Sequence, residues 1–289
     1  MISAEGVSVG FAPPAAARGD KSAPPQFVLN DITFALARGE SVALVGANGS
    51  GKTTLLRVLA ALLSPERGRV EFDGIDVATD EGRRAARAGI GVLFSNPDLT
   101  LIAPTVEREI AFGLENLAWQ RPDMLARVDE LLAAFDLSAR RADSPLALSG
   151  GERARLGLAA AIAPRPDFLF IDESLSLLDA EHRADVRGLI ADTQRDAEMA
   201  VLWATQDFEE ARTADRIVIL YGGTIAGEVA RADVPHSLDL LEDAGLAVSA
   251  VARVAAYLRA CEIDPGPSLD SIEMARFLDE ARVAARPGA

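Results

Sequence analysis

A glycine-rich turn between an apolar strand and a helix is the feature that most constrains this chain. Residues 46–54 read Gly-Ala-Asn-Gly-Ser-Gly-Lys-Thr-Thr and match the pattern G-x-x-x-x-G-K-[ST]. An apolar run at 41–45 precedes the turn and a helical pattern follows over 53–63, which is the context that this motif requires. Glycines let the backbone wrap around an anion, and a helix N-terminus adds partial positive charge. The segment therefore predicts a loop that binds polyphosphate.

The residue types in this loop predict specific contacts. Those expected to contact a bound nucleotide are Gly46, Asn48, Gly49, Ser50, Gly51, Lys52, Thr53 and Thr54. Lys52 would reach the β- and γ-phosphates, and Thr53 would offer its hydroxyl to Mg²⁺. Lys52 is one of only two lysines among 29 basic residues, the other being Lys21. This scarcity favours a phosphate-binding lysine over an ordinary glycine-rich turn that happens to precede one.

Composition excludes several other classes of protein. The chain has 289 residues and a net charge of −15, whereas a duplex nucleic-acid binder needs a basic surface. Its single cysteine, Cys261, excludes a disulfide framework and is expected to be a buried apolar residue. The sequence contains no uncharged apolar run of about 18 residues that would span a membrane, and no secretory signal pattern. The acidic cluster Asp207, Glu209 and Glu210 is interpreted as a solvent-exposed face.

Apolar runs alternate with helical patterns along most of the chain. The runs expected to form strands are 7–11, 32–36, 41–45, 68–72, 90–94, 168–171, 200–203 and 216–220. Helical patterns cover 53–63, about 107–164 and about 180–195, and a separate helical segment begins near His236. This alternation predicts an α/β fold with a largely parallel sheet. The Pro/Ala-rich stretch 12–25 predicts a surface loop, whose role the sequence does not indicate.

A second motif combines an apolar strand with two carboxylates. The strand at 168–171 is followed directly by Asp172 and Glu173. In phosphoryl-transfer sites the first carboxylate holds Mg²⁺, usually through water, and the second orients or deprotonates the attacking water. A strand that ends at a solvated acidic turn would look the same in isolation. The motif follows the phosphate loop by about 120 residues, a spacing that favours the catalytic interpretation.

A third motif starts a helix. Ser149, Gly150, Gly151 and Glu152 follow Leu148 and precede a helical pattern. A Ser-Gly-Gly helix start presents backbone N–H groups that can bind an anion. The same residues predict a capping box, since Ser149 can cap the helix and Glu152 lies three positions further on. The two roles are compatible.

The three motifs, in this order and spacing, resemble the ATP-binding subunits of ABC transporters. The resemblance covers at least 7–230, with Walker A at 46–54, the signature at 148–152 and Walker B at 168–173. It implies a P-loop NTPase fold over 1–235, with a RecA-like parallel sheet core, an antiparallel β subdomain and a helical subdomain over about 97–165. It also implies that the chain binds ATP and Mg²⁺ and hydrolyses ATP to drive transport.

The resemblance further implies that two ATPase subunits pair with two ATP molecules between them. Each site would combine Walker A and Walker B of one chain with the signature and D-loop of the other. The residues lent in trans would be Ser149, Gly150, Gly151, Glu152 and Asp179. Phe11 lies where the family has an aromatic residue that stacks on adenine, although a core phenylalanine at the end of a strand fits equally well.

A narrower resemblance is to the ATPases of energy-coupling factor transporters of the vitamin and cobalt/nickel types. It rests on 94–98, 103–106 and 109–113, and on a similar tail at 240–246, 254–258 and 268–278. It implies that 236–289 is a helical extension that helps two ATPases pair; a generic helical extension is the alternative. The implied partners are a second ATPase subunit, a transmembrane coupling subunit at the cytoplasmic face of the cell membrane and, indirectly, a substrate-binding membrane subunit. No nucleic-acid partner is expected.

The sequence departs from the family pattern at two positions that face the γ-phosphate. The family has a glutamine after the strand at 90–94, where this chain has Ser95, whose side chain is too short for the same contacts. The family has a histidine after the strand at 200–203, where this chain has Gln206. An amide donates a hydrogen bond but lacks the positive charge that a protonated histidine brings to such a bond. By position, neither His182 nor His236 can substitute.

These departures predict a catalytic site that retains Lys52 and Glu173 but is degenerate at Ser95 and Gln206. Loss of one preorganised transition-state donor typically lowers a rate by about 10²–10³. The hypothesis is therefore an impaired half of an ATPase heterodimer, which binds ATP and lends its intact signature to the partner. The alternatives are a self-paired subunit that tolerates both changes, a soluble ABC ATPase acting on nucleic acid or ribosomes, and a regulatory ATP-binding module. The sequence does not indicate the transported substrate.

Overall fold

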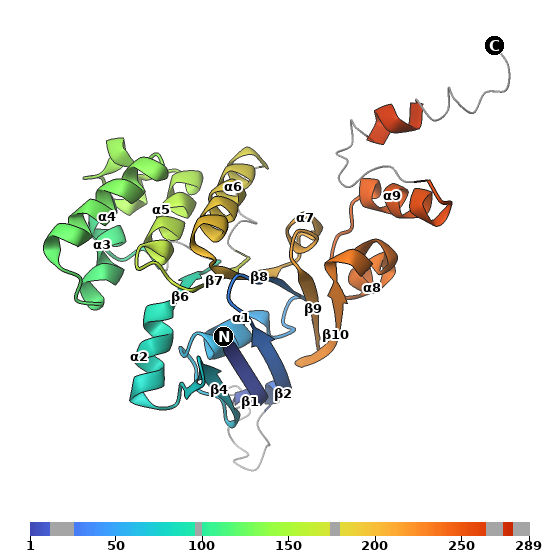
Figure 1. Ribbon diagram of the computed structural model, residues 1–289, viewed down its shortest axis with the longest axis horizontal. Helices are drawn as coiled ribbons and strands as arrows, with labels where there is room; N and C mark the ends of the chain where they lie inside the picture. Colours follow the sequence, from blue (N-terminus) through green and yellow to red (C-terminus); the bar gives the residue numbers. More distant parts are fainter. Residues whose placement is uncertain (12–25, 96–99, 174–179, 264–273, 280–289) are drawn as a thin grey trace, which may run out of the picture.

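A six-stranded sheet forms the centre of the molecule. The computed structural model describes residues 1–11, 26–95, 100–173, 180–263 and 274–279. The central sheet has the order β10-β9-β3-β8-β7-β6, in which β9 to β6 are parallel and β10 is antiparallel to β9 (Figure 1). Its strands are β3 (Ser41–Val45), β6 (Ile90–Leu93), β7 (Phe168–Asp172), β8 (Ala200–Thr205), β9 (Arg216–Tyr221) and β10 (Thr224–Ala230). Every residue of β3, β7 and β8 is buried, as expected of strands covered on both faces.

A second, antiparallel sheet packs against the central one across helix α1 (Lys52–Leu59). Its order is β2-β1-β4-β5. Its strands are β1 (Ile2–Phe11), β2 (Gln26–Leu36), β4 (Arg67–Phe72) and β5 (Ile75–Asp76). Leu55 and Leu56 of α1 are buried in one core with residues of both sheets, and the rings of Phe72 and Phe168 meet edge to face at 5.7 Å. This core fixes the position of the segment that leads into α1.

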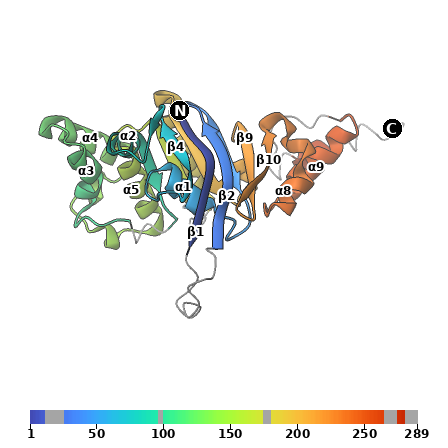
Figure 2. The same cartoon turned by 90° about the horizontal axis from the view of Figure 1, so that it is seen from below.

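A group of helices lies at one end of the central sheet (Figure 2). It consists of α3 (Val106–Asn116), α4 (Arg121–Ala134), α5 (Gly150–Ile162) and the short 3-10 helices Ser138–Arg140 and Pro145–Ala147. Its buried residues share a second core with Leu169 and Ile171 of β7 and with residues of α6 (Ala180–Ala197). Helix α2 (Asp80–Gly89) joins β5 to β6.

The C-terminal segment lies at the opposite end of the molecule (Figure 2). It contains a 3-10 helix (Arg231–His236), α8 (Leu238–Asp243), α9 (Ala250–Ala260) and a helical stretch at 274–279. Leu241 and Leu246 are buried in a third core with Phe208 of α7 (Phe208–Ala211) and residues of β3 and β9. The first part of the segment is therefore packed onto the central sheet. Within the described ranges, no helix has the length and apolar character needed to cross a bilayer.

The α/β fold with a largely parallel sheet is confirmed, and the structure differs from the predictions in several details. The helix predicted over 53–63 ends at Leu59, and Ala61 has a φ of 54°, which stops the helix. Cys261 follows α9 and is exposed, so the prediction of a buried cysteine is wrong. Strand β10 and helix α2 are elements that the sequence patterns did not indicate. The Pro/Ala-rich stretch 12–25 lies outside the described residues.

Candidate active site

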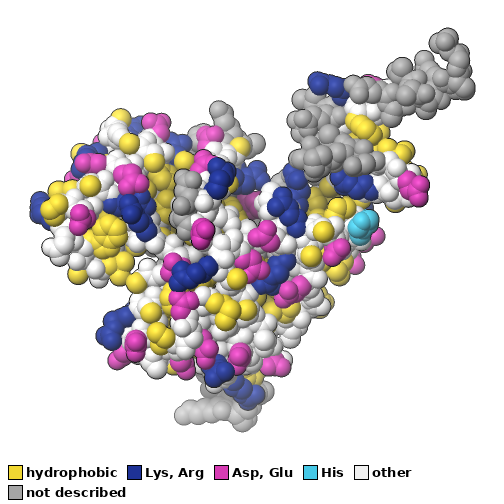
Figure 3. Space-filling view, in the orientation of Figure 1, with side chains coloured by type: hydrophobic (Ala, Val, Ile, Leu, Met, Phe, Trp, Pro, Cys, Tyr) yellow, Lys and Arg dark blue, Asp and Glu magenta, His cyan; other side chains and the backbone are white. Residues whose placement is uncertain are grey.

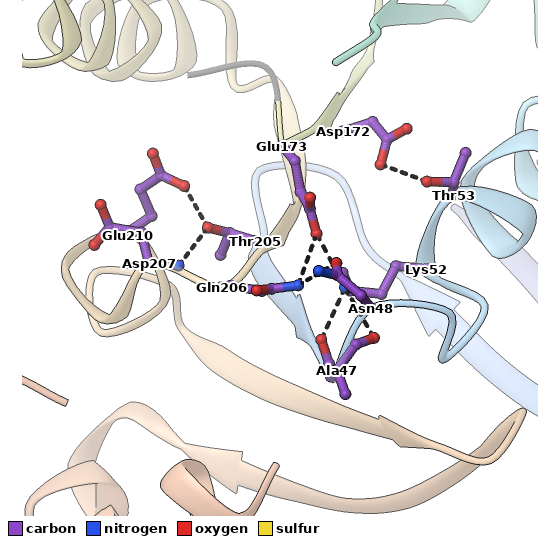
Figure 4. A network of polar contacts seen from close by, with 11 residues as sticks. Ala47, Asn48, Lys52, Thr53, Asp172, Glu173, Thr205, Gln206, Asp207 and Glu210 are labelled. Carbon is purple, nitrogen blue, oxygen red and sulfur yellow. Dashed lines mark hydrogen bonds and ion pairs between the residues drawn. The ribbon is translucent and has the colours of Figure 1, made fainter. Parts of the chain in front are cut away.

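Three motifs meet where neighbouring parallel strands end. The phosphate loop follows β3, the two carboxylates end β7, and Gln206 follows β8, which lies between β3 and β7 in the sheet. Because parallel strands present their carboxyl ends at one edge, their terminal residues form a common site there. Figure 4 shows these side chains pointing toward one another from the three strand ends.

The phosphate loop is built by close backbone packing. Gly51 immediately precedes α1 with a φ of 108°, and a Cβ there would lie 2.7 Å from Leu29 Cδ2. A Cβ on Gly46 would lie 2.3 Å from the carbonyl oxygen of Leu220 and 2.6 Å from Ser50 Oγ. A side chain at Gly46 would collide with backbone, and one at Gly51 would displace the buried Leu29 side chain, so glycine is the residue that fits both positions. Of the remaining predicted loop residues, Asn48 and Gly49 are exposed and Thr54 is half-buried on α1.

Lys52 is buried at the start of α1, with 5% of its surface exposed. Its Nζ donates to the carbonyl oxygen of Gly46 at 2.8 Å and to that of Ala47 at 3.4 Å. The same nitrogen forms an ion pair with Glu173 Oε1 at 3.0 Å. The ammonium group is thus held at the phosphate loop and joined to the second carboxylate of β7.

The donor set around Thr53 suits a hard cation. Thr53 Oγ1 donates to Asp172 Oδ1 at 2.9 Å. Asp172 is buried, and this desolvation raises the pKa of its carboxyl, partly offset by the Thr53 hydrogen bond. Hydroxyl and carboxylate oxygens are ligands that Mg²⁺ prefers, and a cation would also favour the ionised form of Asp172. Nearby in the loop, Ser50 Oγ is buried and has no hydrogen-bond partner among the residues that the structure describes. These features fit a magnesium-bound nucleotide.

Glu173 is contacted by side chains from both the phosphate loop and the segment after β8. Its backbone has a φ of 49°, a left-handed conformation that costs a non-glycine residue about 1–2 kcal/mol, and its N–H donates to Ala204 O at 2.9 Å. Gln206 Nε2 lies 3.4 Å from Glu173 Oε1 and donates to Asn48 Oδ1 at 2.7 Å. Gln206 therefore links the phosphate loop to Glu173. The sequence predicted each of these residues but not the contact between Gln206 and Asn48.

The Ser-Gly-Gly motif starts α5 in the helical group. Ser149 Oγ accepts from the Glu152 N–H at 3.2 Å, and Glu152 Oε2 accepts from the Ser149 N–H at 2.8 Å, which forms the expected capping box. The Ser149 N–H lowers the pKa of Glu152, and the ion pair with Arg140 contributes in the same direction. A Cβ on Gly150 would meet no atom within 4 Å. The open space beside Gly150 leaves the start of the helix accessible.

The remaining predicted residues lie at the margins of the site. Ser95 is exposed just after β6, next to Phe94, whose ring lies 6.0 Å from the Arg57 guanidinium carbon. Phe11 is the last residue of β1 and pairs with Gln26 of β2. Asp179 lies outside the described residues.

Two contacts near the site were missed from the sequence. Glu210 is only 6% exposed and its Oε2 accepts from Thr205 Oγ1 at 2.5 Å, so the interpretation of this carboxylate as solvent-exposed is wrong. The apolar neighbours Phe208 and Ala211 were the available signal of burial. Gly245 of the C-terminal segment lies against the phosphate loop, since a Cβ there would be 3.4 Å from Ala47 Cα. No local sequence pattern indicates that second contact.

Comparison with protein families and relatives shows which proteins the chain resembles. A family model described as ABC transporter matches residues 29–176. The energy-coupling factor transporter ATP-binding protein EcfA1 of Symbiobacterium thermophilum is 40% identical over 224 residues, which cover 78% of this chain and 77% of the relative. EcfA1 of Lactococcus lactis subsp. lactis is 36% identical over 229 residues, covering 74% and 82%.

Solved structures show the same fold. The structure of cbiO1 from Clostridium perfringens, part of the ABC transporter complex cbiONQ, has a TM-score of 0.71 at 22% identity and covers 88% of this chain and 97% of its own. The dimeric structure of MJ0796, a bacterial ABC transporter cassette, has a TM-score of 0.70 at 25% identity and covers 80% and 99%. The fold is therefore the ABC ATPase fold, a P-loop α/β core with an antiparallel subdomain.

Proposed function

Because the chain belongs to the ABC transporter family, as an ATP-binding protein of the energy-coupling factor type, we propose that it energises import of a vitamin or a transition metal ion. The chain is an ABC-type ATPase. In the proposed importer it pairs with a second ABC ATPase and drives a transmembrane coupling subunit at the cytoplasmic face of the cell membrane. A separate membrane subunit binds the substrate, so the ATPase does not select it.

One observation carries the assignment of the catalytic side chains: Lys52, Glu173 and Gln206 are joined at the phosphate loop by contacts of 3.0 and 3.4 Å. Lys52 and the loop N–H groups bind the phosphates of ATP. Thr53 and Asp172 would hold Mg²⁺, which would supply charge neutralisation for the phosphates. Glu173 orients the attacking water or takes its proton. In this state the ion pair between Glu173 and Lys52 is broken, because Lys52 binds the phosphates of ATP and Glu173 contacts the water instead.

We further propose that this site turns ATP over slowly. Gln206 occupies the position of the family's histidine and contacts Asn48 and Glu173 through an uncharged amide. Ser95 is exposed at the other degenerate position. The N-terminus of α5 keeps its serine cap and both glycines. The chain would thus bind ATP as a clamp while Ser149, Gly150, Gly151 and Glu152, with Asp179, complete the partner's site.

An apolar groove beside Ser95 supports docking of the coupling subunit. It has a volume of about 170 Å³ and is lined by residues of β6, α3 and α5 and of the segment after β6, including Leu93, Phe94 and Phe112. Glu109 is buried, and its carboxylate accepts from the N–H groups of Ile102 and Ala103 at 2.8 and 2.6 Å. These two hydrogen bonds hold the loop in a position where the Ile102 side chain is 65% exposed. Phe112 on α3 is 43% exposed. A helix of a membrane subunit with apolar side chains fits such a surface.

The extension 236–289 presents apolar side chains suited to pairing with the second ATPase. Tyr257 on α9 is 71% exposed and Leu240 on α8 is 51% exposed, and no residue of α9 is fully buried. Figure 3 shows hydrophobic side chains gathered on this part of the molecule. A surface helix with an uncovered apolar side typically marks a contact with another protein.

The test of the proposed function is the ATPase rate of the full chain alone and with its partner ATPase. Alone, the chain is expected to bind ATP in a Lys52-dependent manner and to hydrolyse it at least about 10²-fold more slowly than the pair. In the pair, Glu173→Gln of this chain is expected to change the rate less than about twofold, whereas Gly150→Asp, which obstructs the lent helix start, abolishes most of it. A chain that alone hydrolyses ATP as fast as the pair, in a Glu173-dependent manner, would overturn the impaired-site proposal.

A further inference from the structure

Glu210 is a buried carboxylate to which the proposed reaction assigns no role. It lies on α7 and is 6% exposed. Burial raises the pKa of its carboxyl, which reflects the free-energy cost of keeping a charge away from water. Its Oε2 accepts from Thr205 Oγ1 at 2.5 Å (Figure 4). Burial of the Glu210 carboxyl costs free energy, and Glu210 is bonded to Thr205, the neighbour of Gln206. This arrangement suggests a role for Glu210 at Gln206.

The Thr205 hydroxyl closes a small ring of bonds around Gln206. Thr205 is the last residue of β8 and is 3% exposed. Its Oγ1 donates to Glu210 and also accepts from the Asp207 N–H at 2.9 Å, so its two bonds reach both α7 and the far side of Gln206. Asp207 is held further by an ion pair with Arg183 at 3.0 Å and by a β-bridge to Ala247. The backbone is therefore fixed on both sides of Gln206.

We propose that Thr205 and Glu210 are positioning residues for Gln206, which hold its backbone so that the amide points at Asn48 and Glu173. The bond between Gln206 Nε2 and Asn48 Oδ1 is 2.7 Å long, and a rotation of the peptide at 206 would break it. Glu210 accepts the hydroxyl hydrogen of Thr205 and so orients the hydroxyl. A lone pair of Thr205 Oγ1 then points at the Asp207 N–H and accepts its hydrogen bond. The inference rests on the proposed function, because the positioned amide matters only at a nucleotide site.

Two substitutions remove one or both bonds of the Thr205 hydroxyl, and two retain them. Thr205→Val deletes both bonds of the hydroxyl, and Glu210→Ala deletes its acceptor, whereas Thr205→Ser and Glu210→Gln keep a hydroxyl and an accepting oxygen. Thr213→Val is the matched control. Thr213 Oγ1 donates to the backbone oxygen of Glu210 at 2.8 Å, so this change removes a bond of the same kind at α7 without touching the ring around Gln206.

The experiment measures release of a fluorescent ATP analogue from the full chain, combined with a double-mutant cycle. Thr205→Val and Glu210→Ala are each expected to speed release about two- to tenfold, the effect of one hydrogen bond, as Gln206→Ala does. The Ser and Gln variants and Thr213→Val should stay close to the wild-type rate. In a Gln206→Ala background, Thr205→Val should add nothing, because its effect passes through the missing amide. Additive effects, or an equal effect of Thr213→Val, would overturn the proposal.

A second measurement is independent of nucleotide. The side-chain amide signal of Gln206 in the NMR spectrum of the nucleotide-free chain, assigned by its loss in Gln206→Ala, is expected to shift in Thr205→Val and Glu210→Ala but not in Thr213→Val. An unchanged signal in the first two variants would refute the positioning role. Absence of Lys52-dependent binding in the wild-type chain would instead refute the proposed function, so the two failures are distinguishable.

Discussion

At the scale of single residues, Gln206 is the side chain whose chemistry most affects the expected rate. Gln206→His places an imidazole where the uncharged amide now contacts Glu173, and a protonated imidazole donates a charge-assisted hydrogen bond. We expect hydrolysis at this site to rise at least about tenfold, a fraction of what one transition-state donor contributes. Single-turnover hydrolysis, measured in the pair with the partner's phosphate-loop lysine substituted, checks this. Gln206→Asn is the control, and an equal rate for the two variants would contradict the impaired-site proposal.

Asp172 provides a prediction about pH. Burial raises the pKa of Asp172, so the folded chain favours the protonated form relative to the unfolded chain. Its contribution to stability is therefore fully present below the unfolded-state pKa of about 3.9 and is lost as pH rises through the folded-state pKa. Asp172→Asn mimics the neutral form and should raise the melting temperature of the nucleotide-free chain at pH 7.5 by about 2–4 °C, with the difference vanishing near pH 4.

Differential scanning calorimetry at several pH values measures this difference. Asp239→Asn is the control, because the Asp239 side chain is 96% exposed and such surface changes alter stability by less than about 0.5 kcal/mol. A melting temperature for Asp172→Asn below that of the wild-type chain at pH 7.5 would show that the ionised carboxylate stabilises the nucleotide-free fold.

At the scale of an element, the entry into α1 depends on backbone that only glycine can supply. Gly51→Ala places a side chain at a φ of 108° and 2.7 Å from Leu29 Cδ2. The conformational cost alone is about 1–2 kcal/mol, and the contact adds to it. Gly49→Ala shares the positive φ, at 80°, but its Cβ would meet no atom within 4 Å.

We therefore expect Gly51→Ala to lower both the unfolding free energy and the affinity for ATP more than Gly49→Ala does. Chemical denaturation and equilibrium binding of a fluorescent nucleotide measure the two effects. Equal losses in the two variants would mean that positive φ, and not the close packing against Leu29, limits the loop.

The elements differ in how well sequence patterns predicted them, for physical reasons. Strands β3 and β7 are buried on both faces, so their apolar runs are continuous and easy to identify. Strand β10 is an edge strand with alternating exposure, and its apolar pattern is weak. The pair Gly222–Gly223 was the available signal, because it marks a tight turn between β9 and β10.

At the scale of the whole molecule, the first part of the C-terminal segment packs onto the central sheet. Leu241 is fully buried against the sheet, and Gly245 follows it against the phosphate loop. Leu241→Ala should cost about 2–5 kcal/mol through the cavity it leaves and should weaken ATP binding by loosening the Gly245 contact. Leu240→Ala is the matched control, since Leu240 is 51% exposed. Hydrogen exchange of residues 245–247 and of the phosphate loop, together with nucleotide affinity, tests both expectations.

The candidate site was predictable from the sequence only in part. The identities of Lys52, Asp172 and Glu173 followed from local motifs. Their meeting depends on the order of the parallel strands, which the sequence patterns did not indicate. The burial of Glu210 and the contact of Gly245 with Ala47 depend on how distant segments pack, which no local pattern encodes. The domain boundary between residues 235 and 236 stays a prediction. The residues that this chain would contribute to a partner's site also stay a prediction, because they would act on a second subunit.

The turn at Gly245–Ala247 lies next to the phosphate loop, at Ala47, and is joined to the segment after β8 by the bridge between Ala247 and Asp207. Coupling through this turn obeys thermodynamic reciprocity: the factor by which a bound partner changes the affinity for ATP is also the factor by which ATP changes the affinity for the partner. The chain can bind nucleotide first and then the proposed partner through α8 and α9, or the partner first and then nucleotide. These two orders are the two routes of one thermodynamic cycle. The order in which they occur changes the kinetics of assembly but leaves the final stability of the loaded complex the same.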